Sequence, residues 1–294
     1  MSVFWLKVFA LVSMVIDHTA AVFTEAVPSP MLSGRAVALM GAAGRAAFPL
    51  YAFLLVEGFS HTRDWRKYAL RLFGLGVFSQ LPYAFTLNEW VAYSQMPWWR
   101  RVCDLNVLFT LTLGVLLLAF LRHTGRLDRA FGSWWMAGAL AALAAAFYAS
   151  TLQSTALALG VAAALTAAAR FAPRLRPLAG QAARFVLFAF PFFWLLRRNI
   201  PLPGGGTFHF SFDYGFYGLV FFAALYWART PRLRAAVIVC WGLWLFSEDF
   251  AGVLLAAVLV ACYNGKRGPD DHRLFYWAYP AHLFLLWGAR LLLG

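Results

Sequence analysis

The sequence predicts an all-α protein, a polytopic membrane helix bundle of about eleven transmembrane helices with its amino terminus in the cytoplasm. Of the 294 residues, 62% are hydrophobic and 18% aromatic, and only 13% are charged, against about 25% in a soluble domain. Apolar runs close to the ~20 residues that span a bilayer recur along the chain. Basic residues gather in alternate connecting segments, as the positive-inside rule predicts.

The predicted helices follow one another with short connections. They span roughly residues 4–24, 36–58, 67–87, 105–121, 133–149, 151–169, 182–197, 213–228, 234–247, 249–263 and 273–292. Two reversals are tight, near Ser150 and at Ser247-Glu248-Asp249, and the count would change if either pair were one broken helix. We find no internal repeat and no soluble appendage, so residues 1–294 are predicted to form a single transmembrane domain.

The basic residues set the predicted orientation. One set of alternate connections is rich in Arg and Lys near residues 63–67, 122–129, 170–176, 229–234 and 266–273, whereas the other holds Arg35, Arg100, Arg101, Arg197 and Arg198. The first set is therefore expected in the cytoplasm. The net charge of +13 favours anionic lipid headgroups over nucleic acid as the partner. Cys103, Cys240 and Cys262 form no CxxC pattern, so we expect no disulfide framework and no metal site.

Three ionisable side chains are predicted to share one depth in the outer half of the membrane. "SMVIDHTAAVF" (13–23) carries Asp17 and His18 inside an apolar run, with His18 about 21 Å from the cytoplasmic boundary. Arg45 lies ~13 Å below the outer boundary on the next helix. Because adjacent helical residues point ~100° apart, we expect Asp17 to pair with Arg45 and His18 to face a different space.

Buried charges of this kind have two interpretations. An Asp–Arg pair can simply fix the register of two helices, and a membrane histidine can simply bind a backbone carbonyl. Their cost nevertheless makes function the default hypothesis. His282 on the last helix, and Asn106 and Asp213 near the outer ends of theirs, are further candidates.

A second polar cluster is expected at the cytoplasmic face. "VEGFSHTRDWRKYALR" (56–71) contains Glu57, His61, Arg63, Arg66, Lys67 and Arg71. Glu57 and His61 share a helix face at i,i+4, and "YNGKRG" (263–268) adds Asn264 and Lys266 on the same side. The positive-inside rule alone explains the cations, but together these groups could cradle a phosphate-rich ligand.

Six segments, in order along the chain, resemble the TraX family, membrane proteins named for the pilin N-acetylase of conjugative plasmids. They are "LKVFALVSMVIDH" (6–18), "GRAAFPLYAFLLVEGFSHTRDWRKYALRL" (44–72), "NVLFTLTLG" (106–114), "DYGFYG" (213–218), "YNGKRG" (263–268) and "FYWAYPAHL" (275–283). The resemblance implies a multi-pass protein of the bacterial inner membrane. It also implies acetyl transfer from acetyl-CoA to an amine, in the parent case the pilin amino terminus, or to a hydroxyl in wider relatives.

The resemblance matches polar residues named above only by position, so the roles that follow are a hypothesis drawn from their chemistry and predicted depth. Catalytic roles go to His18, Asp17 and Arg45, with His18 removing the acceptor's proton or first taking the acetyl group itself and Arg45 stabilising the oxyanion. Acetyl-CoA binding goes to Glu57, His61, Arg63, Lys67, Arg71, Asn264 and Lys266. Binding of an acceptor protein, peptide or glycan goes to Asn106, Asp213 and His282.

Two other functions stay open at this point. A proton-coupled transporter would use Asp17, His18 and His282 as relay groups, and predicts inverted repeats and helices broken by Gly or Pro. Pro49 and Pro280 are the residues that could break helices here. A non-catalytic pilus or secretion assembly subunit would explain the aromatic-rich surface, but not the acid–base groups at one depth.

Overall fold

The computed structural model describes residues 1–25, 33–87, 102–127, 134–148, 153–172, 174, 176–196, 200–201, 207–208, 211–245, 250–269 and 272–293. Its fold class is all-α, as predicted. The helices are α1 (Val3–Glu25), α2 (Gly34–Gly44), α3 (Ala47–His61), α4 (Trp65–Thr86), α6 (Val107–His123), the 3₁₀ turn η2 (Thr124–Leu127), α8 (Trp134–Tyr148), α9 (Gln153–Phe171), α10 (Arg176–Leu196), α11 (Gly215–Trp227), α12 (Pro231–Leu245), α13 (Phe250–Ala261) and α14 (His272–Leu293).

Among the described residues, two short strand pairs, which the sequence did not predict, connect segments between the helices. β1 (Asp104–Leu105) pairs in parallel with β4 (Ser211–Phe212). β2 (Ile200–Pro201) pairs antiparallel with β3 (Thr207–Phe208). Each strand is two residues long, so each pair only holds two connecting segments together. The first of them brings the start of α6 beside the start of α11.

Each predicted helix has a counterpart in the predicted order, but the second divides into α2 and α3 at Arg45–Ala46. Pro49 explains the division. It has no N–H to donate to the carbonyl of Arg45, and its ring crowds that carbonyl, so it is tolerated only in the first turn of α3. Pro280, in contrast, lies inside α14 without ending it. The tight reversals at Ser150 and at Ser247–Asp249, and Arg100, Arg101, Arg197 and Arg198, lie outside the described residues.

Within the residues that the structure describes, two segments are long and apolar enough to cross a membrane by length and composition: Val3–Phe23, and Gly34–His61 across α2 and α3. Four shorter apolar stretches are Val107–His123, Leu159–Ala169, Gly215–Trp227 and Phe250–Ala261.

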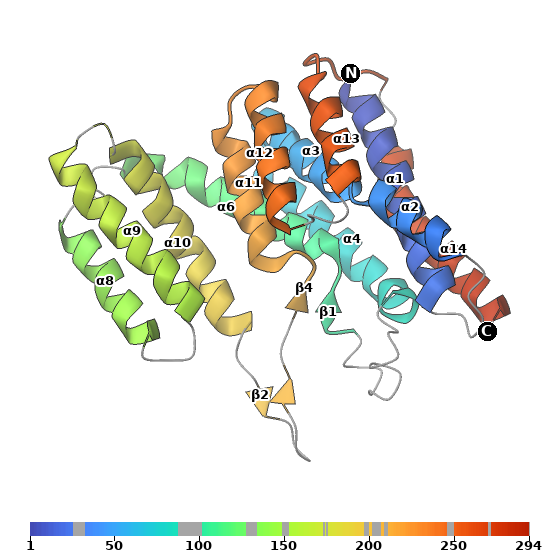
Figure 1. Ribbon diagram of the computed structural model, residues 1–294, viewed down its shortest axis with the longest axis horizontal. Helices are drawn as coiled ribbons and strands as arrows, with labels where there is room; N and C mark the ends of the chain where they lie inside the picture. Colours follow the sequence, from blue (N-terminus) through green and yellow to red (C-terminus); the bar gives the residue numbers. More distant parts are fainter. Residues whose placement is uncertain are drawn as a thin grey trace. The chain divides into compact units, whose positions relative to one another are not determined.

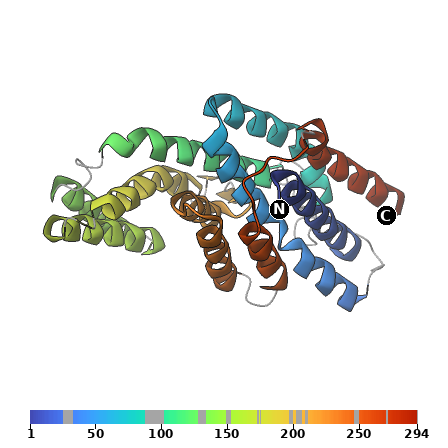
Figure 2. The ribbon, with the colours of Figure 1, turned by 90° about the horizontal axis from the view of Figure 1, so that it is seen from above.

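The chain divides into two compact units, residues 1–115 with 210–294, and residues 116–209. The prediction of one domain over the whole chain stays a prediction. In the first unit α1 packs on α2, α3 and α14, α14 also packs on α4, and α12 packs on α13. Figures 1 and 2 show α1 and α14 side by side, although the two helices lie at opposite ends of the sequence. The second unit contains none of the predicted site residues.

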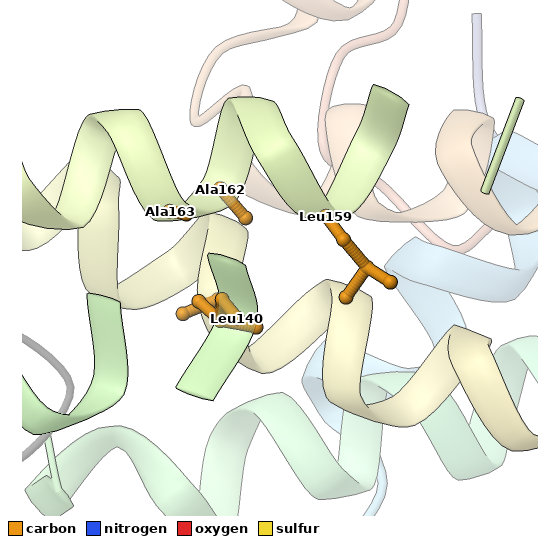
Figure 3. Close-up of a cluster of buried hydrophobic side chains, with 5 residues drawn as sticks. Leu140, Leu159, Ala162 and Ala163 are labelled. Atoms are coloured by element: carbon orange, nitrogen blue, oxygen red, sulfur yellow. The ribbon is translucent and has the colours of Figure 1, made fainter. Parts of the chain in front are cut away.

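A buried cluster in the second unit combines three alanines with two leucines. Leu140 on α8, Leu159, Ala162 and Ala163 on α9, and Ala183 on α10 form one buried cluster. Figure 3 shows Leu140 beneath the α9 residues. Alanines at the contact let helix backbones approach closely, which suits packing between apolar helices.

Glycine allows a close helix contact in the first unit. Gly252 on α13 faces α2, and a Cβ there would strike the carbonyl oxygen of Ala42 and lie 3.1 Å from the amide nitrogen of Ala46. Both atoms belong to the backbone, so neither can move without displacing a helix.

Replacing Gly252 with Ala should therefore destabilise the protein. Overpacking of this kind costs about 1–3 kcal/mol, so we expect a lower Tm in thermal unfolding of the purified protein. Gly74→Ala on α4 is the matched control, because no atom lies within 4 Å of its Cβ position and alanine favours a helix over glycine by ~1 kcal/mol. Equal Tm values for the two variants would contradict the predicted close approach.

Candidate functional site

His18 on α1 and His282 on α14 form a side-chain pair inside the first unit. Nδ1 of His18 lies 2.7 Å from Nε2 of His282. The rings stack with their centroids 5.0 Å apart and a 25° angle between planes. His282 is buried, whereas His18 is half-buried and keeps some exposed surface. The sequence analysis named His18 and His282 as separate candidates and did not predict that they form a pair.

The hydrogen bonds assign the protons of this pair. Nδ1 of His282 lies 3.0 Å from the carbonyl oxygen of Ala278, one helical turn earlier. A carbonyl only accepts, so Nδ1 of His282 carries a proton and its Nε2, in the neutral ring, is an acceptor. His18 therefore donates from Nδ1 to His282. The Nε2 of a neutral His18 is left with its lone pair, which is what a general base requires.

Asp17 points to a different neighbour. Its Oδ1 lies 4.0 Å from Nη1 of Arg45, with about a third of each side chain exposed (32% and 33%). The pair is the one predicted, at the outer limit of a direct ion pair. Asp17 also packs tightly over Gly44, where a Cβ would collide with its carboxylate. Gly44, which has no Cβ, thus gives the Asp17 carboxylate its space, and the next residue, Arg45, lies opposite Asp17.

Asp213 anchors a second polar group next to the histidines. Tyr83 on α4 donates its hydroxyl to Oδ2 of Asp213 at 2.9 Å. The backbone of Asp213 donates to Leu105 at 3.2 Å and accepts from the hydroxyl of Thr110. Asp213 also lies within electrostatic range of Asp17. The predicted residues Asp17, Arg45, His18, His282 and Asp213 therefore belong to one region of the first unit.

The residue after Asp213 carries backbone strain. Tyr214 has φ 60°, the left-handed region that costs most residues about 1 kcal/mol or more. Its ring stacks on Phe48, with centroids 3.6 Å apart and planes within 8°. Tyr214 lies within electrostatic range of Asp17, Arg45 and Asp213. The stacking on Phe48 holds Tyr214 in this conformation, directly after Asp213.

Asn106 occupies a structural position rather than an open one. It is fully buried and accepts from the amide of Leu108 at 3.0 Å, which caps α6. Its side-chain amide donates to the carbonyl of Gly76 and to Gln80. Gln80 in turn donates to the carbonyls of Val102 and Asp104. Asn106 thus holds α4 against the start of α6.

The Glu57 side chain connects the end of α3 with the start of α12 and the segment after α13. Arg234 at the start of α12 donates to its Oε2 at 2.6 Å, and Tyr263, just after α13, donates to its Oε1 at 3.0 Å. Arg234 also donates to the carbonyls of Leu225 and Ala228. His61 lies 3.8 Å from Oε1 of Glu57 and contacts the Glu57 carbonyl through Nδ1 at 2.9 Å. Both carboxylate oxygens of Glu57 are thus used in structural contacts, while its ligand-binding role stays a prediction.

The remaining predicted cations are exposed at this same end. His61, Arg63, Lys67 and Arg71 lie at the surface, and Lys67 pairs with Asp64 at 3.5 Å. Asp64 caps α4, and the backbone N–H of Lys67, followed by its charge, lowers the pKa of the Asp64 carboxyl.

The basic turn after α13 lies against the beginning of α1. Asn264 accepts from the amide of Lys266 through its side chain and donates its own amide to Met1. The carbonyl of Lys266 accepts from Val3. Gly265 and Gly268 have φ 74° and 79°, which glycine adopts at no steric cost. The hydrogen bond from Tyr263 to Glu57 joins this turn to the end of α3.

The site contains residues that the sequence interpretation missed. Gln80, Tyr83 and Tyr279 are neutral polar groups. Apart from Asn106, the candidates on apolar helices are ionisable residues, so these three were not singled out. Tyr263 and Tyr279 nevertheless lie inside the quoted segments "YNGKRG" and "FYWAYPAHL". Arg234 had been assigned to the positive-inside pattern. Across the residues that the structure describes, no group of three or more His, Cys, Asp or Glu side chains could hold a metal ion.

Comparisons with known proteins agree with the segments quoted above. A protein described as a probable fimbrial assembly protein FimC, serogroup H1, from Dichelobacter nodosus is 37% identical over 124 residues, which are 40% of this chain and 45% of that protein. The aligned part thus spans about half the length of that relative. No solved structure matches the chain. The family model described as TraX protein matches residues 2–197 and 207–290. The chain therefore belongs to the TraX protein family.

Proposed function

We propose that this chain is a multi-pass inner-membrane acetyltransferase. It moves an acetyl group from cytoplasmic acetyl-CoA to an amine or hydroxyl of an acceptor protein, peptide or glycan on the outer side. The observation that carries this proposal is the Ala278–His282–His18 hydrogen-bond chain, which leaves a lone pair on Nε2 of a half-buried histidine. Group transfer needs such a base, whereas helix packing does not.

Exposed apolar side chains support a membrane location. Leu39, Phe78, Trp277 and Leu285 belong to a larger set of exposed large hydrophobic residues on the helices of the first unit. A lipid bilayer as partner would cover them. Helix ends that the sequence predicts on the same side of the membrane also meet one another in the structure. Glu57, Arg234 and Tyr263 meet at the end expected in the cytoplasm, while β1 and β4 pair at the starts of α6 and α11, expected outside.

In the proposed reaction the acceptor nitrogen or oxygen attacks the thioester carbonyl carbon. His18 takes the acceptor's proton at Nε2, and its Nδ1–H keeps the hydrogen bond to His282. The new C–N or C–O bond forms, the C–S bond breaks, and the proton passes from His18 to the departing thiolate. The products are the acetylated acceptor and free coenzyme A, so no oxidant or metal is required.

The donor side of this proposal rests on the exposed cations at the other end of the first unit. His61, Arg63, Lys67, Arg71 and Lys266 offer charged donors of the kind that bind phosphates. His18 lies fifteen residues into α1 from Val3, about 22 Å along the axis. The phosphates would therefore bind well away from the reacting carbon.

Removing the base should slow turnover strongly. We expect His18→Ala to lower kcat by about 10²–10⁴-fold, measured as acetyl transfer from labelled acetyl-CoA to a peptide amine by the purified protein in detergent. His282→Ala should lower it by a smaller factor, because His18 loses only its orienting partner. The matched control is His123→Ala, since Nδ1 of His123 also bonds a carbonyl one turn earlier, Ala119 at 2.7 Å. Wild-type turnover by His18→Ala would refute the assignment.

The cytoplasmic cations give a separate prediction on binding. Arg63→Ala and Arg71→Ala should each raise the Kd for coenzyme A about 10-fold, because a charge-assisted hydrogen bond to phosphate is lost. Arg35→Ala removes the same charge at an exposed position at the start of α2, expected on the outer side, and should leave the Kd unchanged. Unchanged affinity in both Arg63 and Arg71 variants, by isothermal titration, would refute this placement.

A second candidate function is a non-catalytic role in pilus or fimbria assembly. The printed name of the Dichelobacter nodosus relative favours it. The break at Arg45 is the kind of feature that a transporter would have, although we find no repeat in the sequence. Acetyl transfer by the wild-type protein separates the acetyltransferase from both alternatives.

A further inference from the structure

Tyr279 has a buried hydroxyl that the fold does not use. Its side chain on α14 is 6% exposed. The hydroxyl has no hydrogen-bond partner among the residues that the structure describes. A buried polar group without a partner costs roughly 1–3 kcal/mol, and such groups are rare enough that each requires an explanation.

Neighbouring polar groups make the contrast clear. Tyr83 donates to Asp213, and Asn106 is hydrogen-bonded through both its side-chain oxygen and its side-chain nitrogen. Ser79 and Thr86 on α4 also lack partners, but a short hydroxyl on a helix can rotate to bond the carbonyl one turn earlier. The hydroxyl of Tyr279, at the end of a rigid ring, cannot reach its own helix backbone.

The position of Tyr279 relates it to the histidine pair. It precedes His282 by three residues, so both lie on one face of α14. Its ring meets His282 edge-on, with centroids 5.5 Å apart and planes at 73°. Tyr279 also lies within electrostatic range of Asp213 and Tyr51. Asp213 already accepts a hydrogen bond from the Tyr83 hydroxyl. It forms none with the hydroxyl of Tyr279.

We propose that the Tyr279 hydroxyl hydrogen-bonds the carbonyl oxygen of the acetyl group while that group is transferred at His18. This inference rests on the acetyl transfer proposed above. When the acceptor attacks the carbonyl carbon, the C=O electron pair moves to oxygen, and the tyrosine O–H donates to the oxyanion without giving up its proton. The bond re-forms as the thiolate leaves. The hydroxyl that is costly in the free protein is then satisfied in the transition state.

Tyr279→Phe tests this role because it removes only the hydroxyl and keeps the ring against His282. We expect kcat for acetyl transfer to fall about 100-fold, while the KM for acetyl-CoA changes less than about 3-fold. Tm should stay the same or rise, since an unsatisfied buried group is removed. Tyr276→Phe, one turn nearer the start of α14 and 37% exposed, is the matched control and should behave as wild type.

The outcomes are separable. A Tyr279→Phe protein with wild-type kcat, or one whose lower activity accompanies a lower Tm, would overturn the proposed role. Absence of transfer by the wild-type protein would overturn the acetyltransferase function and this role with it.

Discussion

A polar side chain on an apolar helix has to meet a polar group from elsewhere in the fold, because burial without a hydrogen bond costs several kcal/mol in the absence of water. The first unit is organised around this requirement. His18 meets His282, Tyr83 meets Asp213, Asn106 meets Gln80, and Glu57 meets Arg234 and Tyr263. Each contact joins segments far apart in the sequence, so the polar groups select which helices pack together.

These contacts differ in whether they satisfy every hydrogen-bonding atom of the groups involved. The Glu57 and Asn106 networks satisfy their central groups from several directions and hold helix ends together. In the histidine pair, Nε2 of a neutral His18 keeps its lone pair. The hydroxyl of Tyr279, whose ring contacts His282, has no hydrogen-bond partner among the described residues. The first kind of network explains why the helices stay in register. The second kind supplies the groups that a group-transfer reaction needs, within a single unit of the fold.

Much of this arrangement could be predicted from the sequence, for physical reasons. Helix positions follow from the length and apolarity of each run, and the Asp17–Arg45 contact follows from their equal depth. The sequence marked Pro49 as a residue that could break a helix, but the apolar run over residues 36–58 continues across it, so one helix was predicted where the structure has α2 and α3. The histidine pair was missed because helix order does not reveal which helices are neighbours: α1 packs on α14. Neutral groups such as Gln80 and Tyr279 carry no charge to mark them in an apolar run.

The central claim is transfer between two sides of a membrane, from a donor at the basic face to an acceptor near the histidine pair. Sealed proteoliposomes with labelled acetyl-CoA on one side only, and a peptide amine on the other side only, test it most directly. Mass spectrometry of the peptide should show acetylation when acetyl-CoA is on the side of residues 61–71. An unlabelled peptide in that arrangement, or one labelled only when donor and acceptor share a side, would contradict the account.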